Sequence, residues 1–248
     1  MRQYDKLLVQ WDATKKESGI SAGKAIIDKI NELLQSKNEL RMIFAAAPSQ
    51  SEVLAYLVSH KDEVAWEKIT AFHMDEYIGL DKNDTNRFSS FLRANIFDHI
   101  PFGKVHFIDS DNPLEVTRYS GLLSEKPIDI VCLGIGENGH LAFNDPPVAN
   151  FNDPEVVKVV ELDPVCRQQQ VNDGCFDQLS DVPKQAVTLT IPTLFQAGYL
   201  YCVVPGESKK EAVHKTLHDE ISEACPSTIV RSHENCILYV DQDACPGL

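Results

Sequence analysis

Several features are scarce in this chain of 248 residues, and each absence excludes a class of protein. No apolar run approaches the roughly 18 residues that a membrane-spanning helix requires. The opening residues 1–6 lead into no apolar block of a signal peptide, so we expect a cytoplasmic protein without a membrane partner. Basic residues are few, 23 against 37 acidic ones, and the formal net charge of −14 argues against general nucleic-acid binding.

Cysteine is present but is not arranged as a disulfide framework or a metal motif. The seven cysteines are an odd number, they are scattered, and none forms a C-x-x-C pair. This usage is typical of free thiols in a reducing compartment, and it predicts no zinc site. With 43% hydrophobic residues and no repeat or linker, the chain has the composition of a single globular domain over residues 1–248.

Short apolar runs rich in β-branched residues alternate with amphipathic helical patterns along the chain. This alternation predicts a three-layer, Rossmann-like α/β fold with a mainly parallel sheet and helices on both faces. Residues 164–183 are polar and show little periodicity, which predicts an active-site cover near 150–184. An ordinary surface loop would have the same sequence character. Strands are expected at 42–47, 67–74, 104–108, 128–133, 156–162, 186–191, 199–204 and 236–240, and helices at 18–35, 53–58, 86–99, 113–123 and 213–217.

The stretch 134–147, directly after the expected strand 128–133, concentrates the chemistry. Its three glycines let the turn approach a ligand closely while His140 is presented at the rim. Asp145 follows, fixed by two prolines, and an imidazole near a carboxylate can take and return protons. A lone histidine is more often a hydrogen-bonded structural residue, but this density of Gly, Asn, His, Asp and Pro favours a site.

The same glycines spell G-x-G-x-x-G, the motif of a dinucleotide-binding loop. That motif needs a helix to begin at the loop, because the helix amino end holds the pyrophosphate. Pro146 and Pro147 prevent a long helix from following Gly139. We therefore expect no nicotinamide or flavin cofactor.

Two acidic residues, Asp75 and Glu76, come directly after the expected strand 67–74. Partial burial raises the pKa of a carboxylate and makes it a better base at neutral pH. Acidic pairs are also common in surface loops. The position after a strand, where open α/β sheets bind ligands, favours a catalytic role.

Two helix starts are candidate anion sites. The first is the turn after strand 42–47, where Ser49, Gln50 and Ser51 offer side-chain donors beside free backbone N–H groups. One of these serines could equally be a simple N-cap. The second is Lys209-Lys210, which is unfavourable at a helix start unless an anion lies nearby, although a solvated lysine pair remains the alternative.

Together these motifs resemble the glucosamine-6-phosphate deaminase (isomerase) family, within the wider group that includes 6-phosphogluconolactonases. The matching stretches are 72–80, 134–146, 206–209 and 226–233, and the Asp-Glu-Tyr and Asn-Gly-His-Leu-Ala-Phe-Asn blocks are the specific ones. The resemblance implies an enzyme that opens the sugar ring, moves the C2 proton to C1 and releases ammonia to give fructose 6-phosphate.

The resemblance also implies residue roles. Asp75 would be the enolising base and His140 the ring-opening acid and base, oriented by Asn138 and Asp145. The phosphosugar would be bound by Lys209 and the Ser49-Gln50-Ser51 turn, which would hold the phosphate, and by Gly139 and Arg167. The route requires no cofactor and no metal. The expected partner is a small phosphosugar, and a homo-oligomer is compatible with the family.

Three departures from the family pattern concern substrate recognition. Asp145 stands where Glu is common, the first phosphate turn lacks the usual Thr and two glycines, and Arg167 is displaced by about two positions from the arginine of the family's mobile cover. Glucosamine 6-phosphate is the expected substrate. Galactosamine 6-phosphate, lactone hydrolysis and a sugar-phosphate sensor are the alternatives. The lactonase pattern lacks Phe143-Asn144-Asp145, and a sensor would not need a proton carrier at each end of the path.

Overall fold

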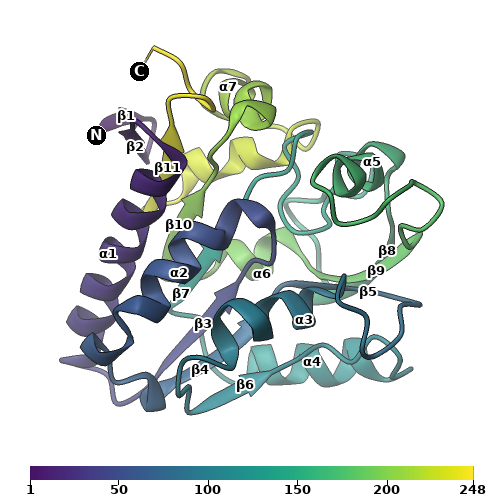
Figure 1. Ribbon diagram of the computed structural model, residues 1–248, viewed down its shortest axis with the longest axis horizontal. Helices are drawn as coiled ribbons and strands as arrows, with labels where there is room; N and C mark the ends of the chain where they lie inside the picture. Colours follow the sequence, from purple (N-terminus) through teal and green to yellow (C-terminus); the bar gives the residue numbers. More distant parts are fainter. Residues whose placement is uncertain (248) are drawn as a thin grey trace.

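The computed structural model describes residues 1–247, and its central feature is an eight-stranded sheet. The strand order is β1-β2-β11-β10-β7-β3-β4-β6, and every neighbouring pair is parallel except β1 with β2 (Figure 1). The strands are β1 (Arg2–Tyr4), β2 (Leu7–Asp12), β3 (Leu40–Phe44), β4 (Ile69–His73), β6 (Lys104–His106), β7 (Ile130–Leu133), β10 (Tyr199–Val203) and β11 (Cys236–Asp241).

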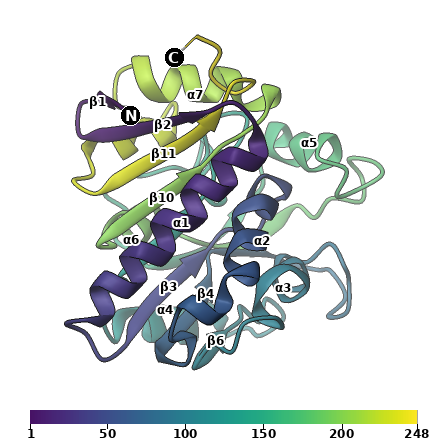
Figure 2. The same ribbon diagram turned by 60° about the vertical axis from the view of Figure 1, so that its left-hand side comes forward.

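Helices cover both faces of this sheet, because the strand side chains alternate between two buried clusters. Met42 and Phe44 of β3 share one cluster with α1 (Lys15–Leu34), α2 (Ser51–Ser59) and α3 (Phe88–Leu92), which cross the front of the sheet in Figures 1 and 2. Ile43 belongs to the other cluster, with α4 (Glu115–Ser124), α6 (Ile191–Phe195) and α7 (Lys210–His218). The predicted three-layer, Rossmann-like fold with a mainly parallel sheet is confirmed.

A second sheet departs from the prediction. Strands β5 (Asp75–Tyr77), β9 (Gln185–Leu189) and β8 (Val157–Glu161) form a separate three-stranded antiparallel sheet. We expected the segments of β8 and β9 to join the parallel sheet. Instead the chain turns at Met74, directly after β4, and the Met74 carbonyl accepts a hydrogen bond of 2.8 Å from the backbone N–H of Leu189.

Other differences are local. The pair β1–β2 was not predicted, and the expected helix 86–99 is α3 followed by a π-helical turn at Arg93–Phe97. The polar segment after Leu162 contains α5 (Pro164–Asn172), whose Asp163 side chain caps the Val165 N–H. Short 3₁₀ turns occupy Pro48–Gln50, Lys61–Glu63, Trp66–Lys68, Glu207–Lys209 and Pro226–Ser232. Among residues 1–247, no helix has both the length and the apolar character needed to cross a membrane.

Candidate active site

A small cleft lies at the carboxyl ends of the parallel strands. Its free volume is about 60 Å³, and Asp75 and His140 both line it. The loops after β3, β4, β7 and β10 all contribute, as expected for ligand sites of open α/β sheets. The lining residues are Ala45, Ala46, Ala47, Ser49, Met74, Asp75, Phe88, Gly134, Ile135, Gly136, His140, Ala142, Phe143, Gln169, Gln170 and Lys209.

Hydrogen bonds determine which nitrogen of His140 carries a proton. Its Nδ1 lies 2.8 Å from Oδ1 of Asn138 and 3.0 Å from Oδ1 of Asp145. The backbone N–H of His140 also donates to Asn138 Oδ1, and Asn138 Nδ2 donates to Asp145 Oδ1, which orients the amide. Because both neighbours of Nδ1 are acceptors, the neutral ring carries its hydrogen on Nδ1. The Nε2 lone pair is then free to take a proton.

The Asp145 carboxylate is kept ionised by these partners. Burial alone would raise the pKa of Asp145, but the hydrogen bond and the charge of His140, together with the hydrogen bond from Asn138, lower it below its usual value. An ionised Asp145 in turn stabilises a positive charge on the ring. The Asp145–His140 pair is therefore suited to shuttling protons.

Glycine is required in the turn that holds His140. A Cβ on Gly136 would stand 2.1 Å from Cε1 of the His140 ring, so the ring occupies the space that a side chain would fill. Gly139 has φ of +85°, and its carbonyl accepts a hydrogen bond from the Ser227 N–H at 2.8 Å. No helix follows within 134–150, where turns and an isolated bridge between Leu141 and Asn144 are found instead.

Asp75 reaches the cleft from the first residue of β5, where it pairs with Thr188 of β9. Its side chain is buried, with 7% of the residue exposed. Burial first, and the negative charge of Glu76 second, raise the pKa of Asp75 well above its usual value. An ionised Asp75 is therefore a stronger base than an ordinary aspartate.

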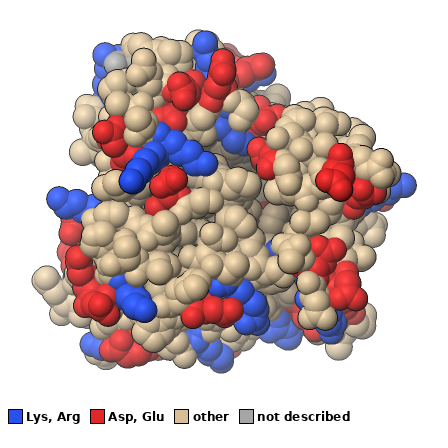
Figure 3. Space-filling view, viewed as in Figure 1, with Lys and Arg blue, Asp and Glu red and all other residues tan. Residues whose placement is uncertain are grey.

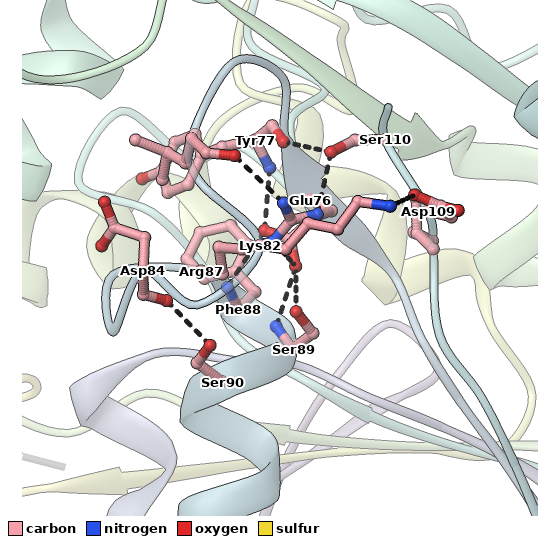
Figure 4. A network of polar contacts seen from close by, with 12 residues as sticks. Glu76, Tyr77, Lys82, Asp84, Arg87, Phe88, Ser89, Ser90, Asp109 and Ser110 are labelled. Carbon is pink, nitrogen blue, oxygen red and sulfur yellow. Dashed lines mark hydrogen bonds and ion pairs between the residues drawn. The ribbon is translucent and has the colours of Figure 1, made fainter. Parts of the chain in front are cut away.

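The neighbouring Glu76 is not among the residues that line the cleft, and it anchors the start of α3 (Figure 4). Its carboxylate accepts hydrogen bonds from the backbone N–H groups of Tyr77, Phe88 and Ser89 at 2.9–3.1 Å, and from Ser89 Oγ at 2.6 Å. Nε of Arg87 lies 3.6 Å away. The carboxylate stabilises the helix amino end, and it fixes β5, and with it Asp75, against α3.

The cleft lining also contains groups suited to an anion. Lys209 is 5% exposed and stands at the amino end of α7, while Ser49 lies in the 3₁₀ turn before α2. Burial lowers the pKa of Lys209, and the charges of Asp173 and Glu137 partly offset this. On the face drawn in Figure 3, acidic and basic side chains are interspersed among uncharged ones, so local groups rather than a broadly basic face would hold an anion.

Comparison with known proteins identifies the family. The sequence profile of the glucosamine-6-phosphate isomerases/6-phosphogluconolactonase family matches residues 13–239. The chain belongs to this family. Proteins named glucosamine-6-phosphate deaminase from Bacillus thuringiensis (strain Al Hakam) and Bacillus cereus (strain AH820) are each 34% identical over 218 residues, which is 87% of this chain and 80% of each relative. The predicted family is confirmed.

Solved structures of the family share the fold. A monomeric glucosamine-6-phosphate deaminase is similar with a TM-score of 0.87 and 28% identity, covering 96% of this chain and 98% of that one. A 6-phosphogluconolactonase from Thermotoga maritima has a TM-score of 0.74 and 20% identity, with 95% and 99% covered. At 20% identity, the similarity to this lactonase shows only that the two proteins share a fold.

Not every residue that the family resemblance suggested lines the cleft of this family member. Nε2 of Gln50 donates to the Val203 carbonyl at 3.0 Å and to Ser49 Oγ at 3.2 Å, so Gln50 supports the turn from behind. Ser51 is the first residue of α2. The guanidinium of Arg167 donates to the carbonyls of Leu179 and Val182, which closes the 163–182 segment on itself. Gly139 contacts the segment 225–227, and like the other three it is not among the lining residues.

Sequence reasoning missed two glutamines that do line the cleft, Gln169 and Gln170 of α5. Oε1 of Gln169 accepts the backbone N–H of Glu137 at 2.8 Å, and its Nε2 donates to Asp173 at 3.2 Å. The first bond ties α5 to the glycine-rich turn. The Asp163-Pro164 start signal indicates a helix here, but no local pattern shows which of its faces meets the cleft.

Proposed function

We propose that this chain converts glucosamine 6-phosphate and water to fructose 6-phosphate and ammonia. The observation that carries the proposal is that Asp75 and His140 line one cleft, with the buried Lys209 in the same lining. Membership of a family whose name includes glucosamine-6-phosphate isomerases, and 34% identity to named deaminases, support it.

The substrate phosphate binds at the helix starts. The Lys209 ammonium neutralises part of its charge, and the turn at Ser49 offers a hydroxyl and backbone N–H groups. This fixes the sugar with its C1–C2 end toward Asp75 and His140. Holding a substrate at one end while two proton carriers meet the other is the positioning that such a reaction needs.

His140 opens the ring. Its Nδ1–H is held between Asn138 and Asp145, so Nε2 takes the proton of the C1 hydroxyl and returns it to the ring oxygen. The product is the open-chain aldehyde. Asp145 stabilises the imidazolium that exists between the two transfers, since it stays ionised.

Asp75 moves the proton between carbons. Its carboxylate takes the C2 hydrogen to give an enolamine, then returns that proton to C1, which leaves an imine at C2. Water adds to the imine, ammonia leaves, and the ketone of fructose 6-phosphate remains. Every proton in this sequence is carried by the chain or by solvent. The raised pKa of Asp75 favours the first transfer, because a stronger base removes a carbon-bound proton more readily.

The deciding experiment is a substrate panel assayed for ammonia and ketose. We expect ammonia from glucosamine 6-phosphate, its loss in Asp75→Asn, and full activity in Asp62→Asn, which alters an exposed acid remote from the cleft. Ammonia only from galactosamine 6-phosphate would move the assignment to the epimer. Hydrolysis of 6-phosphogluconolactone without ammonia release would make the chain a lactonase, and tight binding of the sugars without turnover would make it a sensor.

A further inference from the structure

Three side chains with different metal-ligating atoms meet beneath α5. One ligand atom each from His140, Asp145 and Cys166 lies within 4.8 Å of the other two, and all three residues are buried. Cys166 comes from α5 and has no part in the proposed reaction. We propose that this cluster is a binding site for a soft divalent metal, Zn²⁺ or Cd²⁺, and that occupancy inhibits the enzyme; the inhibition, though not the binding, rests on the proposed function.

The donor set selects the metal. Sulfur, imidazole nitrogen and carboxylate oxygen together are preferred by Zn²⁺ and its heavier relatives, whereas Mg²⁺ and Ca²⁺ take oxygen ligands. Ligands about 2.0–2.3 Å from one zinc ion stand about 3.5 Å apart, so the three atoms need to close by about 1 Å. His140 Nδ1 and Asp145 Oδ1 are already 3.0 Å apart.

A free acceptor in the same cluster points to a missing partner. Oδ2 of Asp145 is buried, with the residue only 1% exposed, and no donor among residues 1–247 lies within ordinary hydrogen-bond distance of it; the Cys166 thiol, a weak donor that also lowers the pKa of Asp145, is the nearby group of the cluster. Buried carboxylate oxygens without partners are rare, because each has lost its water. A metal ion would satisfy this oxygen together with the thiolate.

Charge and protons balance in the bound state. The metal replaces the proton on Cys166 Sγ, which passes to buffer, and it displaces the proton on His140 Nδ1 while Nε2 takes one up from solvent, so the ring stays neutral. A thiolate, a carboxylate and a neutral imidazole then surround the dication, so the buried site carries no net charge. A fourth position stays open for water or for Asn138 Oδ1, which already lies 2.8 Å from Nδ1.

Occupancy would stop the reaction in two ways. With the metal on Nδ1 in place of the hydrogen bonds to Asn138 and Asp145, the neutral ring carries its proton on Nε2, which then has no lone pair to take the C1 hydroxyl proton. The metal also joins α5 to the glycine-rich turn, which Gln169 already contacts through the Glu137 N–H. This would hold α5 closed over a cleft of about 60 Å³, too small to admit a phosphosugar.

The test compares the metal-stripped wild-type protein with Cys166→Ser and with Cys175→Ser, a matched control in the segment after α5. Cd²⁺ titration followed by the ultraviolet thiolate-to-metal charge-transfer band should show one tight equivalent in the wild type and in Cys175→Ser. We expect the band to disappear, and Cd²⁺ affinity to fall at least about 10-fold, in Cys166→Ser. Zn²⁺ should inhibit ammonia release by the wild type and the control, and Cys166→Ser should resist.

A tight Cd²⁺ band of unchanged size in Cys166→Ser would overturn the site, and so would Zn²⁺ stimulation of ammonia release. X-ray absorption at the zinc edge of the wild type needs no variant: one sulfur among nitrogen and oxygen ligands is expected, and a shell without sulfur contradicts the proposal. A wild type that binds Cd²⁺ as described but releases no ammonia would instead refute the proposed function and leave the binding site supported.

Discussion

Replacing Gly136 with alanine tests the geometry of the proposed proton shuttle without replacing a catalytic side chain. The added Cβ would stand 2.1–2.3 Å from Cε1, Nδ1 and Nε2 of His140, whereas ordinary contacts are 3.4–4 Å. Because three ring atoms are met at once, the ring or the turn must move by about 1 Å or more. A shift of this size removes the hydrogen bonds of Nδ1 to Asn138 and Asp145.

The expected result is a fall in kcat of about 100-fold, the usual cost of a 1 Å misplacement in an active site. Overpacking should also lower stability by about 1–3 kcal/mol, which leaves the protein folded at 25 °C. Steady-state ammonia release and a thermal melt measure the two effects separately. Gly121→Ala is the matched control, since Gly121 is an exposed position of helix α4 and a Cβ there meets nothing within 4 Å.

The control should keep wild-type kcat and gain about 0.5–1 kcal/mol of stability, because alanine favours a helix. Wild-type kcat in folded Gly136→Ala would refute the reasoning, since the displaced ring would then be unnecessary for turnover. If Gly136→Ala melts below the assay temperature, it is assayed below its melting temperature beside the wild type, with the same expected loss of kcat.

Three further substitutions, at Asp75, Glu76 and Lys209, test the proposed base and the proposed phosphate site. Asp75→Asn should lower kcat about 10²- to 10⁴-fold. It should also raise Tm near neutral pH, because the raised pKa of Asp75 means that its contribution to stability is present in acid and lost as pH rises through that pKa. The difference in Tm between the variant and the wild type should therefore vanish in acid. The kcat/KM of the wild type should fall as pH drops through the pKa of Asp75. Glu76→Gln should move this fall to lower pH, because it removes the negative charge that is the second cause of the raised pKa. An unchanged pH profile would contradict the role of Asp75 as the base. Lys209→Met should raise KM for the phosphosugar about 10- to 100-fold with kcat little changed, while the exposed neighbour Lys210→Met should change neither; equal effects of the two would place the phosphate elsewhere.

Local sequence patterns were sufficient to predict those parts of the structure that depend on one strand and the turn after it. The apolar run at β7 followed by Gly134, Gly136 and Gly139 predicted a ligand-facing turn bearing His140, and the residues after β4 predicted Asp75 beside it. Both predictions depend only on strand ends meeting at one edge of a parallel sheet. The same reasoning predicted the layers, because alternation along β3 separates the two buried clusters.

Contacts between distant segments were not predictable in this way. The alternating sequence pattern of a strand is the same whether its partner runs parallel or antiparallel. The separate β5–β9–β8 sheet could therefore not be predicted from local sequence. In the sequence, Ser49 and Gln50 are equally good candidate donors for an anion. Only Ser49 lines the cleft, because the Gln50 side chain donates instead to the Val203 carbonyl of β10. The roles of Arg167 and Gln169 are decided by the fold of the 163–182 segment.

The most informative feature of the site is an opposition between two carboxylates that sequence alone treats as alike. Asp145 receives hydrogen bonds from His140 and Asn138, which outweigh its burial and lower its pKa. In Asp75, burial and the charge of Glu76 act in the same direction and raise the pKa. In the proposed reaction, one carboxylate therefore stays charged to support an imidazolium, and the other is basic enough to take a proton from carbon. The proposed ring opening and the proposed proton transfer between carbons need carboxylates of these two different kinds, and a single cleft can supply both because each carboxylate has its own set of neighbours.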